Sequence, residues 1–212
     1  VQLALYLQTK GLVEMIPVML QPEPAEFDAR VRQPGLIWLS SKNIAVNSAP
    51  PKALDLPNYW TRSNKQLWDS YNGVCAYLAI YFEWPTGAAS TDHFVAKSKH
   101  AGDAYEWRNY RLSCLGPNRN KNKFDDVLDP IGLQPDTFVL NLANGKIRPN
   151  PLLTADQKKT AHKTIIRLKL NSPEHNEMRS KWFFRYLRGK DEQILRELSP
   201  FVWYEAQRQG LL

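Results

Sequence analysis

The feature that most restricts how this chain folds is the crowding of proline towards its N-terminus. Residues 16–58 contain Pro17, Pro22, Pro24, Pro34, Pro50, Pro51 and Pro57. Proline lacks an amide donor and fixes its own φ, so this stretch cannot be one long helix or a central strand. We therefore expect residues 1–60 to form an irregular N-terminal arm, with a short helix around 24–33 and a strand over 35–40.

The segment after the arm, residues 61–130, is predicted to hold the functional core. Thr61 can cap the first helix, and the apolar run GVCAYLAIYFEW suits a buried strand or two. PTGAAS then indicates a turn and TDHF a return strand. The expected order is a helix over 62–71, two strands across 73–94, a polar loop to about 107, and a helix after Gly116-Pro117.

Residues 131–212 are predicted to form a β-hairpin followed by a helical cap. DTFVLNLANGKIRP alternates around Asn144-Gly145, the pair preferred in type I′ turns. Helices are expected from a capping box at Thr154 and Gln157 over 155–169, from Ser172-Pro173 to about 188, and from Ser199-Pro200 onward. The fold class predicted for the whole chain is therefore α+β.

Charge and cysteine content narrow the partners and the compartment. The chain has 28 Lys+Arg against 21 Asp+Glu, a net charge of +7, which suits a polyanionic partner such as nucleic acid. It has only two cysteines, too few for a secreted disulfide framework. The opening VQLALYL has no basic leader, and no apolar run is long enough to span a bilayer. We expect a cytoplasmic protein with no membrane partner.

The residues that could carry chemistry are Asp92, His93, Asn109, Asn118 and Lys121. Hydrolysis of a phosphodiester needs a base, for which histidine is suited near neutral pH, and a cation to neutralise the phosphate. Asp92 and Asn118 offer hard oxygen ligands, which suit a magnesium ion that keeps several waters. In an unbroken strand, Asp92 and His93 point to opposite sides. An isolated Asp-His pair more often has a capping or core role, so the residues downstream decide the interpretation.

Those residues carry a resemblance to a known family. YNGVCAYL, TDHFVAKSK and YEWRNYRLSCLGPNRNK, taken in order, resemble the HNH endonucleases, the ββα-metal nuclease family. The resemblance implies a ββα-metal core, with His93 as general base and Asp92 and Asn118 as ligands of Mg²⁺ or Mn²⁺. It implies that Asn109 fixes the loop that orients His93, and that Lys121 falls on the lysine of the family's final helix.

The resemblance extends beyond the core. FVLNLANGKIRPN and TIIRLKLNSPEHNEMR are similar to the C-terminal half of HNH nucleases that accompany ATPases in bacterial anti-phage systems, the Septu-type and retron-associated ones. This similarity implies a defence effector that cuts or nicks DNA and has an ATPase partner. The alternative is a catalytically inactive nucleic-acid-binding module or a regulatory subunit on the same fold.

One departure from the family concerns zinc. Many members carry two Cys-x-x-Cys pairs, whereas this chain has Cys75-Ala-Tyr-Leu78 and Cys114-Leu-Gly-Pro117. One cysteine of each pair is missing, so no structural zinc is expected. Cys75 and Cys114 would then lie near each other as buried thiols. Geometry would allow a disulfide between them, but a reducing compartment argues against one.

The segment around the candidate site is rich in cations. A cluster of this kind is most often a solvated face, but beside a phosphate-cutting site it favours contacts to the DNA backbone. The predicted phosphate contacts are Lys97, Lys99, Arg108, Arg111, Arg119, Lys121 and Lys123.

Overall fold

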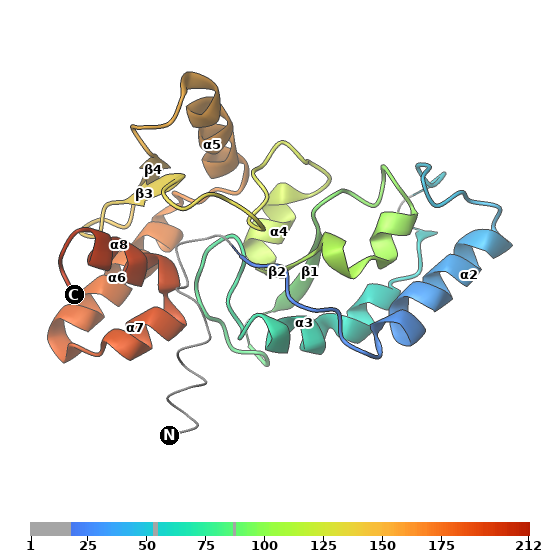
Figure 1. Cartoon of the computed structure of the whole chain (residues 1–212), viewed down its shortest axis with the longest axis horizontal. Coiled ribbons are helices and arrows are strands. Elements are labelled where there is room, and N and C mark those ends of the chain that lie inside the picture. The colour runs from blue at the N-terminus through green and yellow to red at the C-terminus, as the bar shows by residue number, and fades with distance from the viewer. Residues whose placement is uncertain (1–17, 53–54, 87) are drawn as a thin grey trace.

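The computed structural model describes residues 18–52, 55–86 and 88–212 as a mixed α+β chain. Helix α3 (Asn64–Ser70) lies near the middle of the view in Figure 1. The two ends are formed by helix α2 (Gln33–Ser41) and by helices α6 (Pro173–Gly189), α7 (Glu192–Leu198) and α8 (Pro200–Arg208). Between them lie strands β1 (Ala89–His93) and β2 (Tyr110–Cys114) and helix α4 (Leu115–Lys121). None of the helices in the described ranges combines the length and apolar character that crossing a membrane requires.

The N-terminal arm is helical where a strand was expected. A π-helical turn, η1 (Asp28–Arg32), continues directly into α2, so the predicted strand over 35–40 is wrong. Pro34 lies in the first turn of α2, where its missing N–H would have had no helical partner. Gly35 allows close packing, because a Cβ there would lie 2.3 Å from the ring of Tyr105. Residues 1–17 and 53–54 of the predicted arm lie outside the described residues.

The helix expected over 62–71 is present but differs at its start. A 3₁₀ segment, η3 (Tyr59–Ser63), precedes α3. Thr61 lies inside that segment, and its hydroxyl donates to the carbonyl of Asn58, so the expectation that it caps the helix is wrong.

The apolar run over 73–84 forms a buried curl. Cys75 N–H donates to the carbonyl of Ile80, and Ala79, which has a φ of +47°, donates back to Cys75. Within the described residues, its ladder pairing is a single bridge between Val74 and Tyr81. The prediction of strands over 73–84 is wrong. The apolar composition of this run indicates that it is buried, but it does not determine whether the backbone is extended.

The return strand predicted at TDHF is present as β1, which pairs antiparallel with β2 on the other side of the long polar loop. Asp92 lies opposite Arg111, and His93 opposite Tyr110. Helix α4 follows β2 directly, with Cys114 as its N-cap residue. The chain therefore runs strand, loop, strand, helix, and not strand, strand, loop, helix.

The predicted hairpin is confirmed, although its turn differs. Strand β3 (Phe138–Leu140) pairs antiparallel with β4 (Ile147–Pro149). Of the Asn144-Gly145 pair only Gly145 has a positive φ, +69°, so the turn is not type I′, which needs both. The turn packs tightly on the first turn of α6, since a Cβ on Gly145 would lie 1.9 Å from the carbonyl oxygen of Asn176.

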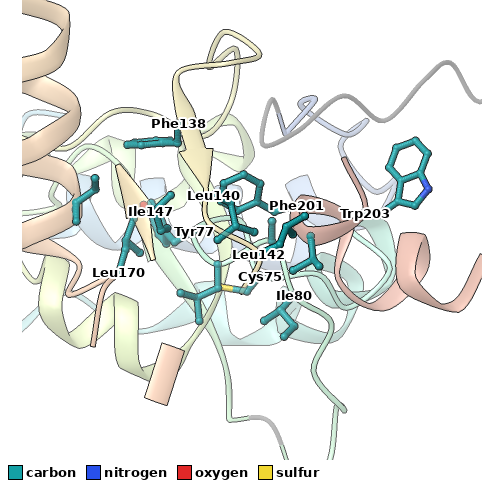
Figure 2. Close-up of a cluster of buried hydrophobic side chains, with 14 of the residues drawn as sticks. Cys75, Tyr77, Ile80, Phe138, Leu140, Leu142, Ile147, Leu170, Phe201 and Trp203 are labelled. Atoms are coloured by element: carbon teal, nitrogen blue, oxygen red, sulfur yellow. The ribbon is translucent and has the colours of Figure 1, made fainter. Parts of the chain in front are cut away.

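The C-terminal helices follow their capping signals. The capping box of Thr154 and Gln157 opens α5 (Ala155–Arg167), as predicted. Ser172 caps α6, which ends at Gly189, and Pro200 opens α8. Helix α7 was not anticipated. Figure 2 shows side chains of the hairpin and of α8 meeting those of Cys75, Tyr77 and Ile80 in one apolar cluster.

A second apolar cluster lies around the arm. Phe27, Val31 and Leu39 pack there with Tyr105, Trp107, Tyr110 and Leu112. The arm therefore shares its core with the long loop and with β2.

We predict that Gly145→Ala lowers the free energy of unfolding by about 2 kcal/mol or more, because it combines a strained φ with a backbone clash. The control is Gly189→Ala, where the new Cβ has open space and should change stability by less than about 1 kcal/mol. Urea denaturation of both variants measures the difference. Equal stability of the two variants would contradict this packing of the hairpin on α6.

Candidate functional site

Asp92 and His93 lie at the end of β1 and point to opposite sides of the strand, as alternation requires. Asp92 faces helix α4 and the buried curl, whereas His93 faces Trp60, Tyr110 and the long loop.

The Asp92 carboxylate is held from two sides. Its Oδ2 accepts a hydrogen bond from the hydroxyl of Tyr77 at 2.5 Å, and its Oδ1 lies 3.2 Å from the Nζ of Lys121. Lys121 also donates to the carbonyl oxygen of His93 at 2.8 Å. Both ionic partners are buried, with 2% of Asp92 and none of Lys121 exposed. This network ties β1, α4 and the curl together.

Burial dominates the electrostatics of this carboxylate. It raises the pKa of Asp92 above its ordinary value, against the opposing effect of the Lys121 ammonium and the Tyr77 hydrogen bond. Burial and the neighbouring carboxylate also hold the pKa of Tyr77 well above its usual range. Tyr77 therefore keeps its proton and remains a hydrogen-bond donor to Asp92.

Asn118 approaches the same strand from α4. Its Nδ2 donates to the hydroxyl of Ser90 at 3.0 Å and more weakly, at 3.5 Å, to the carbonyl oxygen of Thr91. Ser90 lies two residues before Asp92 and so shares its side of β1. In the described part of the chain, no residue donates a hydrogen bond to Asn118 Oδ1.

This donor set suits Mg²⁺ in its chemistry. A carboxylate and a free carboxamide oxygen are hard ligands, and magnesium is commonly bound through one or two protein oxygens and several waters. Asp92 already accommodates one cation, the ammonium of Lys121, at its Oδ1. A divalent ion at Asp92 would have to compete with that ammonium.

His93 is fixed by rings and by one carbonyl. Its Nε2 lies 3.0 Å from the carbonyl oxygen of Ala104, which also accepts from the Tyr110 hydroxyl at 2.7 Å. Trp60 and Tyr110 flank the imidazole in T-shaped arrangements, with ring centroids 4.8 Å and 5.2 Å away. Burial lowers the pKa of His93 to about 3, so the ring is neutral near pH 7.

The contact with Ala104 selects the tautomer. A carbonyl can only accept, so the proton of the neutral ring is on Nε2 and the lone pair is on Nδ1. Among the described residues, Nδ1 has no hydrogen-bond partner. The unprotonated nitrogen is therefore the one left to accept a proton.

Asn109 holds the long loop at both of its ends. Its side chain accepts from Val95 N–H at 2.7 Å and donates to the carbonyl oxygens of Val95 and Asp103 at 3.0 and 2.9 Å. Asp103 directly precedes Ala104, the residue bonded to His93. The side chain of Asn109 thus links Val95 to the part of the loop whose Ala104 carbonyl contacts His93.

The seven cations predicted to contact phosphate divide into three groups. Arg111 is buried in a two-bond ion pair with Asp129, at 2.7 and 2.6 Å, and Lys121 is buried against Asp92. In this conformation neither faces outward, so the expectation of phosphate contacts is revised for both. Lys97 lies 4.2 Å from the Trp60 ring, and Lys99 is paired with Asp125. The remaining three, Arg108, Arg119 and Lys123, are exposed.

Cys75 and Cys114 lie close to each other, as expected from the sequence. Their sulfur atoms are 3.6 Å apart and both thiols are free. Leu78 and Pro117, three positions after Cys75 and Cys114, are buried. No cluster of three or more His, Cys, Asp or Glu side chains able to hold a metal occurs in residues 18–52, 55–86 and 88–212.

Tyr77 and Trp60 are site residues that the sequence did not single out. Tyr77 lies within an apolar run and Trp60 within the proline-rich arm. The sequence around each residue therefore indicates an ordinary core position. Nothing in it predicts the polar neighbour of Tyr77 or the cationic neighbour of Trp60.

Comparison with known proteins adds no relative. No protein-family model matches the sequence, and no curated protein matches it.

We predict that Lys121→Met destabilises the protein by about 3–5 kcal/mol, because it leaves the buried Asp92 carboxylate without its cation. Lys123→Met, at an exposed site two residues on, should change stability by less than about 0.5 kcal/mol. The double variant Asp92→Asn/Lys121→Met should recover most of the loss. Denaturant titration measures all three, and a single variant as stable as the wild type would contradict the buried pair.

We also predict that Asn109→Ala frees the long loop, since it removes the three hydrogen bonds that close it. Amide hydrogen exchange at residues 95–104 should quicken, with a loss of about 1–3 kcal/mol in stability. Asn58→Ala, at an exposed position, is the control. Unchanged exchange in the loop would show that other contacts fix it.

Proposed function

We propose that this protein is a metal-dependent endonuclease of the HNH type that hydrolyses DNA phosphodiester bonds, by cleavage or nicking. One observation carries the proposal: β1, β2 and α4 bring Asp92, His93 and Asn118 to one strand end, while Asn109 closes the loop that contacts His93. Apolar packing alone has no need of this combination of oxygen donors and a neutral imidazole.

Asp92 and Asn118 would hold Mg²⁺ or Mn²⁺, and the ion, when bound, would neutralise charge on the phosphate and the leaving oxygen. Tyr77 keeps the second carboxylate oxygen oriented, because its hydroxyl donates to Oδ2. Lys121 would have to shift away from Oδ1, and its second acceptor, the carbonyl of His93, gives it a partner when it does so.

His93 would act as the general base. Its Nδ1 would accept the proton of the attacking water. The Nε2–H donates a hydrogen bond to the Ala104 carbonyl, which fixes the plane of the ring. A base with a pKa of about 3 is weak. An anionic phosphate beside the ring raises that pKa, because a nearby negative charge favours the protonated imidazole.

Contacts to the DNA backbone are proposed for Lys97, Lys99, Arg108, Arg119 and Lys123, the members of the cationic set that are not buried. Arg108 directly precedes Asn109 in the chain, and Arg119 directly follows Asn118. An ATPase partner, a role in anti-phage defence and a cytoplasmic location rest on the family resemblance and belong to the same proposal.

The test is plasmid cleavage with Mg²⁺ or Mn²⁺ by the wild type, His93→Ala and, as a control, His162→Ala at an exposed position. Loss of a general base should slow cleavage by about 10²–10⁴-fold, and the control should cut at the wild-type rate. Circular dichroism would establish that each variant is folded. Equal cutting by His93→Ala and the wild type would overturn the role given to His93.

The buried ion pair favours a second candidate, a nucleic-acid-binding module without catalysis. Lys121 already neutralises Asp92, so the fold needs no metal to balance that charge. Such a module would bind DNA with strong salt dependence and show no metal-dependent cutting. If the protein neither bound nor cut DNA, the remaining hypothesis would be a regulatory subunit.

A further inference from the structure

The two cysteines take no part in the chemistry proposed above. They are the only cysteines in the sequence, and 39 positions separate them. Cys75 is wholly buried in the larger apolar cluster, where Figure 2 shows its sulfur among the side chains of that core. Cys114 is partly exposed and caps the start of α4.

Backbone contacts hold the two thiols together without a metal. Ala76 N–H donates to the carbonyl oxygen of Leu112 at 2.8 Å, which fixes the curl beside β2. The curl is closed by the bond from Cys75 N–H to Ile80 at 2.9 Å. The two sulfurs therefore meet at 3.6 Å, in a hydrogen bond from the Cys114 thiol to Cys75.

We propose that Cys75 and Cys114 form a reversible oxidation site that closes to an intramolecular disulfide when the protein meets a peroxide. A disulfide has an S–S length of about 2.05 Å, so the two sulfurs need to approach by about 1.5 Å. Small rotations of the two side chains bring them that close.

The reaction balances with one hydrogen peroxide. Cys114, the more exposed of the two, reacts first: its sulfur attacks one peroxide oxygen, the O–O bond breaks, and the departing hydroxide takes up the Cys114 thiol proton to become water. The Cys75 sulfur then attacks the sulfur of the sulfenic acid. An S–S bond forms, the S–O bond breaks, and the departing hydroxide takes the Cys75 proton. Two thiols lose two electrons, and the peroxide becomes two waters.

The hydrogen bond between the thiols favours the second step. The Cys114 S–H points at the Cys75 sulfur, and although burial opposes it, the pKa of Cys75 is lowered to about 7. The sulfur that closes the bond is thus the one with more thiolate character.

The disulfide would join two segments that serve the proposed site. Cys75 lies two residues before Tyr77, which holds Asp92, and Cys114 lies four residues before Asn118. The link would fasten the curl to the β2–α4 junction, at the place where the resembling family has zinc. It forms whether or not the protein is a nuclease, so the two proposals fail independently.

The test treats the purified full chain with hydrogen peroxide and compares it with the reduced protein. Free thiols counted after denaturation should fall from two to none, with a mass loss of about 2 Da and recovery of both thiols on adding dithiothreitol. Closing a loop of this size should raise the Tm by roughly 5–10 °C. Cys75→Ala and Cys114→Ser should each show no rise in Tm on oxidation.

Three results would overturn the proposal. They are retention of both thiols in buffer and in mild urea alike, a mass gain from added oxygen atoms with no disulfide, and a disulfide-linked dimer in place of the intramolecular bond. Because Cys75 is buried, the peroxide treatment is repeated in mild urea, below the unfolding transition, to allow local opening. Failure to form the monomeric disulfide there as well would exclude it.

Discussion

The ion pair between Asp92 and Lys121 is the interaction on which the rest of the site depends. It takes two charges out of water, which costs several kcal/mol for each ion and is recovered only through good geometry and further hydrogen bonds. Tyr77 and the carbonyl of His93 supply those bonds. Because the four groups come from the curl, β1 and α4, the pair fixes how three segments meet.

The ion pair between Asp92 and Lys121 also determines how the protein could bind a metal ion. A divalent cation at Asp92 must displace an ammonium that is already satisfied, whereas Asn118 offers an oxygen with no donor among the described residues. Metal binding would therefore be coupled to movement of one lysine. A phosphate arriving with the metal would give the displaced ammonium a new anionic partner, which links substrate and metal binding.

Local sequence rules predicted several helix starts and the two sides of β1. The predictions failed where the conformation or the partner of a residue depends on segments distant in the sequence. Capping residues placed the starts of α5, α6 and α8, and strand alternation placed Asp92 and His93 on opposite sides. Apolar content misplaced the strands in 73–84, because a curl buried on all sides has the same composition as a buried strand. Charge misassigned Arg111, whose partner Asp129 lies 18 positions away and has no sequence signal that joins them.

The packing of α2 on Tyr105 has a consequence for how the molecule can be divided. Tyr105 follows Ala104, whose carbonyl contacts His93, and its hydroxyl donates to the carbonyl of Pro57. Trp107 likewise donates to the carbonyl of Gln21. The proline-rich segment thus fixes the position of the loop that contacts His93. A fragment that contains only the two strands, their loop and α4 would keep every residue of the motif. It would lose the packing of the arm that positions the loop beside His93.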